Sequence, residues 1–260
     1  MLFPELPLRE RFTAAAAAGF EAVELHYPYE LAPAELDALL RTNALRLALF
    51  NSPRGLIAAG EHGLACAPAH AARFLESIEA AAHYATAVGC PTVNVPTGIV
   101  GRDVAVGDAY RTAVSRLAAA ADRLAAVRVK ASVEALNARD VPGYLLDTTA
   151  SAMRLIRDVG APNLYLQFDV YHAQMAGEDL FAALEAAGDT IGHVQIADVP
   201  GRHEPGTGGI DFELLLKRLD AFGYSGWVGC EYRPLGDTRQ GLGWARPWLR
   251  PVRPAQGHPH

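Results

Sequence analysis

The chain has 260 residues, half of them apolar, and a formal net charge of -6. That length suits one α/β barrel as well as two smaller domains. The acidic balance, without a long basic run, disfavours nucleic acid or an anionic membrane surface as a partner. No apolar segment reaches the roughly 18 residues of a membrane span, and the amino terminus lacks a signal-peptide pattern, so we expect a cytoplasmic protein without membrane contact.

The three cysteines argue against a disulfide-bonded fold and against a zinc site. Cys66, Cys90 and Cys230 are few, odd in number and widely spaced. This pattern indicates neither a disulfide framework nor a zinc motif. We expect them to be ordinary core residues in a reducing compartment.

A recurring junction organises the chain: a helical stretch ends on glycine, and an apolar strand follows within a few residues. It occurs at Gly19, Gly89, Gly160 and Gly223. Glycine suits the left-handed backbone that ends a helix. Successive junctions lie about two β-α units apart, which predicts a parallel sheet with helices outside it, in a (β/α)8 TIM barrel.

Apolar runs and helical periodicity between these junctions give the elements. The predicted strands are 22–28, 45–51, 92–98, 130–136, 164–172, 192–198 and 226–234. The predicted helices are 8–18, 33–42, 69–88, 107–126, 148–159, 178–187 and 211–222. Two long loops, 52–68 and 200–209, follow strand ends, where barrel enzymes place their chemistry.

The amino terminus departs from this scheme, because a closed barrel needs an eighth strand ahead of Leu8 and only Met1–Phe3 stands there. We expect either a truncated first strand or a true start upstream of Met1. An open barrel exposes strand edges, which favours association and a homo-oligomer. We expect a single domain over residues 1–249, with the Pro-rich segment 250–260 as a disordered tail.

Four predicted strands carry an oxygen donor near the carboxyl end: Glu134, Asp169, Gln195 and Glu231. A single carboxylate after a strand is a helix cap or half of a surface ion pair about as often as it is a functional group. Four donors on one rim are more specific, because buried charges need partners and a cation neutralises them. Carboxylate and amide oxygens favour Mg²⁺ or Mn²⁺ over zinc or copper.

Three carboxylates exceed the charge of a divalent ion by one, so one glutamate can carry a proton. We predict that Glu134 and Glu231 are the catalytic pair. An ion that chelates a carbonyl and a neighbouring hydroxyl oxygen acidifies the intervening C–H and stabilises an enediolate. One glutamate then removes a proton, and the other returns it to the adjacent carbon.

Further polar residues near strand ends are candidates for substrate binding, against the alternative that they are structural or surface groups. Arginine suits bidentate contact with a substrate carboxylate, and histidine can donate to a substrate oxygen. The predicted substrate-binding residues are His172, Arg202, His203, Arg233, Asn51 and His62.

Over nearly its whole length the chain resembles the hydroxypyruvate isomerase family, within the xylose-isomerase-like barrel superfamily. The resemblance rests mainly on the segments 19–24, 49–51, 60–64, 193–197, 200–205 and 229–232. It implies a TIM barrel that converts hydroxypyruvate to 2-hydroxy-3-oxopropanoate. It also implies metal ligands at Glu134, Asp169, Gln195 and Glu231, and a catalytic pair at Glu134 and Glu231.

Three functions remain open from the sequence. The leading one is an aldose–ketose type isomerase acting on a small oxo-hydroxy acid. The segment 137–144 is similar to proteins that look like 2-oxo-tetronate isomerases, so a 2-oxo-tetronate isomerase or a ketose epimerase is the nearest alternative. A non-catalytic barrel is the alternative of another class, and metal content together with the activity of Glu134→Gln and Glu231→Gln variants separates it from the enzymes.

Overall fold

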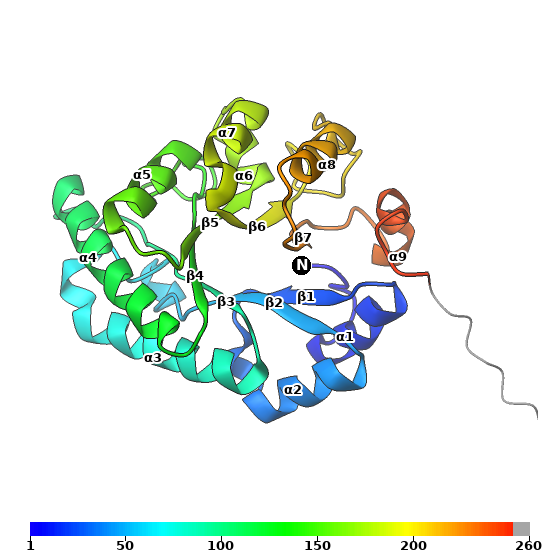
Figure 1. Ribbon diagram of the computed structural model, residues 1–260, viewed down its shortest axis with the longest axis horizontal. Coiled ribbons are helices and arrows are strands. Elements are labelled where there is room, and N and C mark those ends of the chain that lie inside the picture. The colour runs from blue at the N-terminus through cyan, green and yellow to red at the C-terminus, as the bar shows by residue number, and fades with distance from the viewer. Residues whose placement is uncertain (252–260) are drawn as a thin grey trace, which may run out of the picture.

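The structure is a computed structural model, and it describes residues 1–251. The chain forms a seven-stranded, wholly parallel sheet in which the strands follow sequence order. The strands are β1 (Ala22–Leu25), β2 (Arg46–Asn51), β3 (Thr92–Asn94), β4 (Lys130–Glu134), β5 (Leu164–Asp169), β6 (Ile191–Ile196) and β7 (Val228–Cys230). The sheet curls into a nearly closed barrel with the helices around it (Figure 1), so the predicted barrel is confirmed.

Seven helices match the predicted ones. They are α1 (Leu8–Ala17), α2 (Pro33–Thr42), α3 (Ala71–Val88), α4 (Val106–Ala125), α5 (Thr149–Val159), α7 (Leu180–Ala187) and α8 (Phe212–Ala221). The prediction missed the short helices α6 (Val170–Met175) and α9 (Thr238–Gly241). None of the helices in residues 1–251 has both the length and the apolar character to cross a membrane, and the cytoplasmic location stays a prediction.

Most of the predicted strands are too long at the carboxyl end. The clearest error is the predicted strand 164–172, because β5 stops at Asp169 and α6 begins at once. The Asp169 carboxylate accepts hydrogen bonds from the N–H groups of Tyr171 and His172, so it caps α6. The apolar run continues through Val170 and Tyr171 into the helix, which is why hydrophobicity alone did not mark the boundary.

Glycine closes the helices as predicted. Gly89 and Gly160 end α3 and α5 in the left-handed region, at φ values of 66° and 67°. Gly19, after α1, has a φ of 97°, and a Cβ on it would lie 2.6 Å from the Arg250 carbonyl oxygen. The Arg250 N–H donates to Gly19 O. Of the predicted tail 250–260, residues 252–260 lie outside the described residues.

The core lies between the sheet and the ring of helices. Every residue of β3 is buried, and β4 is buried from Ala131 onward. Buried alanines on α3 and α4, such as Ala85 and Ala121, let these helices lie close against the strands. β1 and β7, which do not pair with each other, are only half-buried along their whole length. The amino terminus lies beside the gap between them (Figure 1).

Candidate active site

Three carboxylates meet at the rim formed by the carboxyl ends of the strands. Glu134 ends β4, Asp169 ends β5, and Glu231 directly follows β7. All three are buried. Parallel strands deliver their last residues to the same rim of a barrel, so residues that lie far apart in the chain form one cluster.

The guanidinium of Arg202 lies between two of these carboxylates. Its Nη2 donates to Asp169 Oδ2 at 3.1 Å and to Glu231 Oε1 at 2.5 Å. The guanidinium also lies over the Tyr171 ring, with Cζ 4.7 Å from the ring centroid. Burial by itself would lower the pKa of Arg202, but Glu231 and Asp169 outweigh burial and raise it. Arg202 is therefore a fixed positive charge inside the cluster.

Asp198, just after β6, organises the loop that presents Arg202. Its carboxylate accepts hydrogen bonds from the backbone N–H groups of four loop residues, Val199, Gly206, Gly208 and Ile210. The loop is tightly folded, because a Cβ on Gly208 would clash with the Val199 carbonyl oxygen. Asp198 is buried, so these bonds hold the loop in one arrangement against the barrel.

The two glutamates of the cluster have different electrostatic surroundings. Burial, Glu231 and Asp169 together raise the pKa of Glu134 well above its ordinary range. Burial also opposes ionisation of Glu231, but Arg202 and His26 outweigh it and lower the pKa of Glu231. Burial raises the pKa of Asp169 to about 7 although Arg202 opposes the rise. The cluster thus contains more carboxylates than Arg202 alone can neutralise.

Two asparagines border Glu134 on the barrel wall. Asn94 Nδ2 donates to Asn51 Oδ1 at 3.1 Å and lies 3.5 Å from Glu134 Oε2. Asn51 was a predicted substrate contact. In the structure it is hydrogen-bonded to Asn94, which in turn lies next to Glu134. Asn94 was missed, although an asparagine inside the apolar run 92–98 is a signal that could have identified it.

His172 lies in α6 with its ring turned toward the carboxylates. Asn137 faces Nδ1 with its backbone N–H at 3.2 Å and its Nδ2 at 2.7 Å. Both of these groups are donors, so Nδ1 accepts and Nε2 carries the proton. Nε2 lies 3.7 Å from Asp169 Oδ2. Burial and Arg202 lower the pKa of His172 to about 4. The ring is therefore a neutral donor at neutral pH.

Gln195 is held by its neighbours in the barrel interior. Its Oε1 accepts from Gln167 Nε2 at 2.6 Å, and its Nε2 donates to Glu24 Oε1 at 3.3 Å. Glu24 also lies 2.6 Å from His193 Nε2. A carboxylate only accepts, so Glu24 decides which end of the Gln195 amide faces β5. Glu24 was missed, although it is an acidic residue within an otherwise apolar strand.

For the remaining predicted substrate-binding residues, His203, Arg233 and His62, no side-chain hydrogen bond or ion pair within residues 1–251 reaches the three carboxylates. His203 Nδ1 pairs with the Arg233 carbonyl oxygen at 2.7 Å, and the Arg233 side chain is exposed. His62 is half-buried in the loop after β2, where burial and Arg54 lower its pKa. Contacts of these three with substrate stay predictions. His26, which was missed, lies with Nε2 3.1 Å from Glu231 Oε1.

The geometry of the rim suits a cation. One carboxylate oxygen of Glu134, one of Asp169 and one ring nitrogen of His172 lie within 4.8 Å of one another. The carboxylates are the candidate ligands of this group, because the His172 ring acts as a hydrogen-bond donor there. Glu231 is connected to Asp169 because both carboxylates form ion pairs with the Arg202 guanidinium. Gln195 lies opposite Asp169 in the sheet register. The rim therefore combines hard oxygen donors with one neutral imidazole.

Comparison with known proteins identifies the family. Residues 12–248 match the family model described as xylose isomerase-like TIM barrel. A 2-oxo-tetronate isomerase of Cupriavidus necator is 43% identical over 249 residues, which cover 96% of each chain. A hydroxypyruvate isomerase of Escherichia coli is 40% identical over 248 residues, which cover 95% of this chain and 96% of that one.

Solved structures show the same fold. The crystal structure of a Brucella melitensis protein named AP endonuclease, family 2, superposes with a TM-score of 0.93 at 39% identity, covering 95% of this chain and 96% of that one. A 3-keto-D-glucoside 4-epimerase from E. coli superposes with a TM-score of 0.81 at 22% identity, covering 94% and 96%, and shows the fold alone. The chain is an isomerase and belongs to the xylose isomerase-like TIM barrel family.

Proposed function

We propose that this isomerase is metal-dependent and interconverts hydroxypyruvate and 2-hydroxy-3-oxopropanoate, which is tartronate semialdehyde. The observation that carries the proposal is the cluster of three buried carboxylates, from separate strands, with Arg202 between two of them. Such a site offers proton carriers for a C–H bond and a cation for an acid substrate. The relative named hydroxypyruvate isomerase supports this choice of substrate.

Mg²⁺ or Mn²⁺ fits the donor set. Glu134, Asp169 and Glu231 would supply hard carboxylate oxygens. Gln195 would supply its amide oxygen, which accepts from Gln167 Nε2 in this structure. The raised pKa of Glu134 supports a further positive charge at this point, because it reflects carboxylates in excess of cations. When bound, the ion would polarise the substrate carbonyl and stabilise the negative charge of an enediolate.

Glu134 and Glu231 move the proton. One carboxylate takes a proton from C3 of hydroxypyruvate, which leaves an enediolate across C2 and C3. The other glutamic acid delivers a proton to C2, while the proton on O3 is transferred to O2. C3 thereby becomes the aldehyde, and C2 carries a hydrogen and a hydroxyl. Burial of both side chains keeps water from competing for these protons.

Arg202 and His172 orient the substrate in this proposal. The guanidinium is suited to the substrate carboxylate, which makes two parallel hydrogen bonds with it. The Nε2–H of His172 donates to a substrate oxygen and stays on the ring, because the low pKa of His172 keeps the imidazole neutral. The hydrogen bond from the ring thus stabilises one orientation of the bound substrate, and the ring takes no part in the proton transfer.

A second candidate is isomerisation of a 2-oxo-tetronate, which the 43% identical relative of that name favours. A 2-oxo-tetronate has one more carbon than hydroxypyruvate but undergoes the same proton transfer. The shape of the pocket, and not the carboxylates, would therefore decide which of the two substrates is used. Ketose epimerisation and a non-catalytic barrel are the remaining alternatives. Cleavage of abasic DNA, which the name of the Brucella melitensis protein suggests, is disfavoured here by the net charge of -6.

The test is a substrate panel followed by proton NMR in D₂O with Mg²⁺ or Mn²⁺. Hydroxypyruvate, a 2-oxo-tetronate, ketohexoses and an abasic-site DNA duplex are compared. We expect turnover of hydroxypyruvate with deuterium entering at C2, and loss of turnover after chelation or in Glu134→Gln and Glu231→Gln. Turnover that persists in both variants would remove the proton-carrier assignment, and inactivity on every compound would favour the non-catalytic barrel.

A further inference from the structure

The two arginines that the loops bring to the rim differ in how fully their donors are used. Arg202 donates through Nη2 to Asp169 and Glu231 and through Nε to the Glu231 carbonyl oxygen at 3.3 Å. Arg54 is half-buried in the loop after β2, and its buried Nε has no hydrogen-bond partner among residues 1–251. The ion pairs of that loop in the described residues use Glu61 and not Arg54. A guanidinium that has given up water without gaining an acceptor is ready to meet a ligand oxygen.

The Arg54 guanidinium lies over the ring of Tyr27, which follows β1. Its Cζ is 4.6 Å from the ring centroid, so the ring is a platform for the charge. Burial raises the pKa of Tyr27, Arg54 and Asn51 oppose the rise, and Glu134 adds to it. These influences weaken with distance, so Tyr27 and Arg54 lie near Glu134 and its asparagine neighbours. The phenol keeps its proton at neutral pH and can donate beside the guanidinium.

Arg54 and Arg202 approach the rim from opposite sides. Arg54 belongs to the loop after β2, and Arg202 belongs to the loop after β6. β3, β4 and β5 stand between these two strands in the sheet. In the nearly closed barrel, β2 and β6 therefore lie across from each other (Figure 1). A substrate whose carboxylate lies at Arg202 would extend its other end past the reacting carbons toward Arg54.

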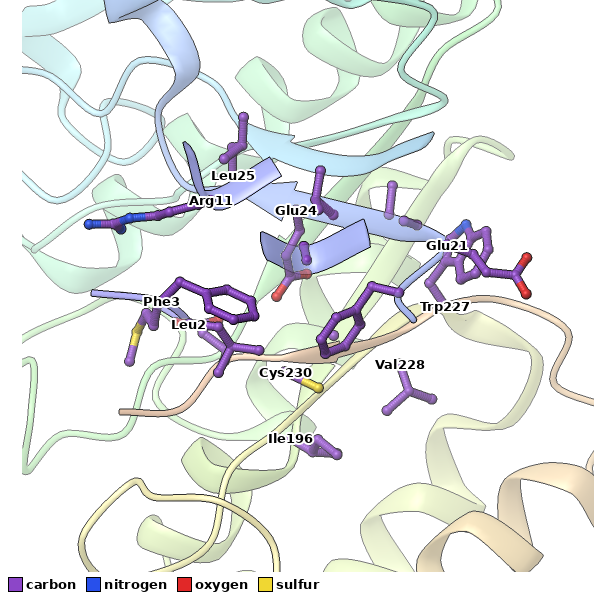
Figure 2. A pocket seen from close by; sticks show the side chains of 18 of the residues that line it. Leu2, Phe3, Arg11, Glu21, Glu24, Leu25, Ile196, Trp227, Val228 and Cys230 are labelled. Carbon is purple, nitrogen blue, oxygen red and sulfur yellow. The ribbon is translucent and has the colours of Figure 1, made fainter. Parts of the chain in front are cut away.

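Open space connects the reacting carboxylates with Tyr27. A cavity of about 580 Å³ is lined by His26, Tyr27 and Glu231, all of which follow strand ends at the rim. Figure 2 shows Glu24 of β1 and Cys230 of β7, which line the same cavity one layer below the rim. A substrate held beside Glu231 therefore has room to reach the Tyr27 platform.

The loop 52–68 is held in place by contacts away from the Arg54 side chain. The Gly63 N–H donates to the Arg54 carbonyl oxygen at 3.0 Å. A Cβ on Gly63 would clash with the Pro96 carbonyl oxygen, so the loop lies directly against the chain that follows β3. Arg116 of α4 donates to the Ala67 carbonyl oxygen at 2.6 Å. The fixed backbone lowers the entropy lost when the Arg54 side chain takes a ligand.

We propose that Arg54 is a specificity-determining residue, which binds a hydroxyl group on the substrate carbon beyond C3. The inference rests on the proposed function, because the carboxylate at Arg202 and the reacting carbons between Glu134 and Glu231 set the direction of the substrate. Hydroxypyruvate ends at C3 and leaves Arg54 without a partner. The C4 hydroxyl of a 2-oxo-tetronate accepts from the guanidinium. Arg54 therefore favours four-carbon acids over three-carbon acids.

The contact is tested by removing each partner in turn. The two acids are 2-oxo-tetronate and 3-hydroxy-2-oxobutanoate, which has the same carbon chain but no C4 hydroxyl. The proteins are wild type and Arg54→Met, which keeps an apolar stem over the Tyr27 ring. The matched control is Arg46→Met, which replaces an exposed arginine at the amino end of β2, the strand that precedes the Arg54 loop.

We expect wild type and Arg46→Met to prefer 2-oxo-tetronate in kcat/KM by about tenfold or more, mainly through KM. Arg54→Met should lose this preference, because a hydrogen bond from a charged donor disappears. Calorimetric Kd values of both acids with Mg²⁺ give the same comparison at equilibrium, with or without turnover.

No preference in wild type, or equal losses on both acids in Arg54→Met, would overturn the proposal, since a merely structural role would weaken both acids alike. A preference in Kd that depends on Arg54, without turnover of either acid, would support the contact and overturn the proposed function alone.

Discussion

Glu134 and Glu231 are the same residue type at equivalent places in the barrel, and each is 8% exposed, yet their surroundings differ. Glu134 meets neutral Asn94 and other carboxylates. Glu231 meets Arg202 at 2.5 Å and His26 at 3.1 Å. The pKa of Glu134 rises and that of Glu231 falls for these reasons. Partners, rather than burial, decide which glutamate keeps its charge.

This difference has an energetic side. A buried ion pair holds its members only while both are present, because removal of one leaves an uncompensated charge. Glu231, Asp169 and Arg202 form such a buried ion pair, which we call the Glu231 side of the site. Glu134 and its neighbour Asn94, the Glu134 side, contain an acid with no cationic partner within residues 1–251. Stability should therefore respond in opposite directions when the two sides are altered, and activity should fall in both cases.

The largest effect is expected from Arg202→Met, which leaves Asp169 and Glu231 facing each other without a cation. We expect the free energy of unfolding of metal-free protein to fall by about 3–5 kcal/mol. Urea unfolding at pH 7 measures it, with exposed Arg233→Met as the matched control. A loss as small as that of the control would mean that Arg202 does not hold the Glu231 side together.

The convergence of the carboxylates at one rim of the barrel was predictable from the sequence for a physical reason. A glycine after each helix and an apolar run after it indicate parallel strands, and parallel strands must bring their carboxyl ends together. Glu134, Asp169 and Glu231 therefore converge in any barrel built from these strands. Arg202 was predicted only as a substrate contact, because its position depends on how the loop 199–210 folds around Asp198.

The contacts that distinguish the two glutamates were not predictable in the same way. Asn94 pairs with Asn51 because the two lie opposite each other in the register of β2 and β3, and the same amide group lies 3.5 Å from Glu134 Oε2. Glu24 lies on β1 and His26 just beyond it, and they contact His193 of β6 and Glu231 after β7, which come from the opposite end of the strand order. Registers and gaps of this kind arise from packing of the whole barrel, which local hydrophobicity does not encode.

Asp198→Asn tests whether the loop, rather than the arginine alone, sustains the Glu231 side. An amide places an N–H group where the carboxylate accepts from Gly206 and Gly208. We expect a loss of about 2 kcal/mol of stability, since the buried side chain of residue 198 would then set an N–H group against these donors instead of an acceptor. We also expect a rise in KM that exceeds the fall in kcat. Exposed Asp103→Asn is the control. Unchanged stability and KM would show that Arg202 is positioned without Asp198.

Glu134→Gln should have the opposite sign. The amide keeps the shape and the contact with Asn94 but removes an acid that burial, Glu231 and Asp169 disfavour as a charge. We expect stability of metal-free protein at pH 7 to rise by about 1 kcal/mol while turnover is lost, as at other sites where function is kept at a cost in stability. Urea unfolding and the NMR assay read the two effects. A destabilised variant would contradict the assignment of an unpaired acid.

The smallest effect is expected for an equivalent pair outside the site. Glu61, in the loop 52–68, accepts two hydrogen bonds from Arg73 at 2.8 and 2.7 Å, but both side chains are partly exposed. Glu61→Gln should cost about 1 kcal/mol or less, because solvent screens the pair. A cost near that of Arg202→Met would mean that burial adds nothing to a glutamate–arginine pair here.

The pH dependence of that cost identifies its origin. Arg73 lowers the pKa of Glu61 from 4.5 to about 2. A depressed carboxyl pKa stabilises the fold above the unfolded value and ceases to do so as pH falls through the folded value. The difference between wild type and Glu61→Gln should therefore be full at pH 7, shrink below pH 4.5, and vanish near pH 2. Urea midpoints of both proteins across this range give the curve, and a difference that stays constant with pH would assign the cost to packing instead of charge.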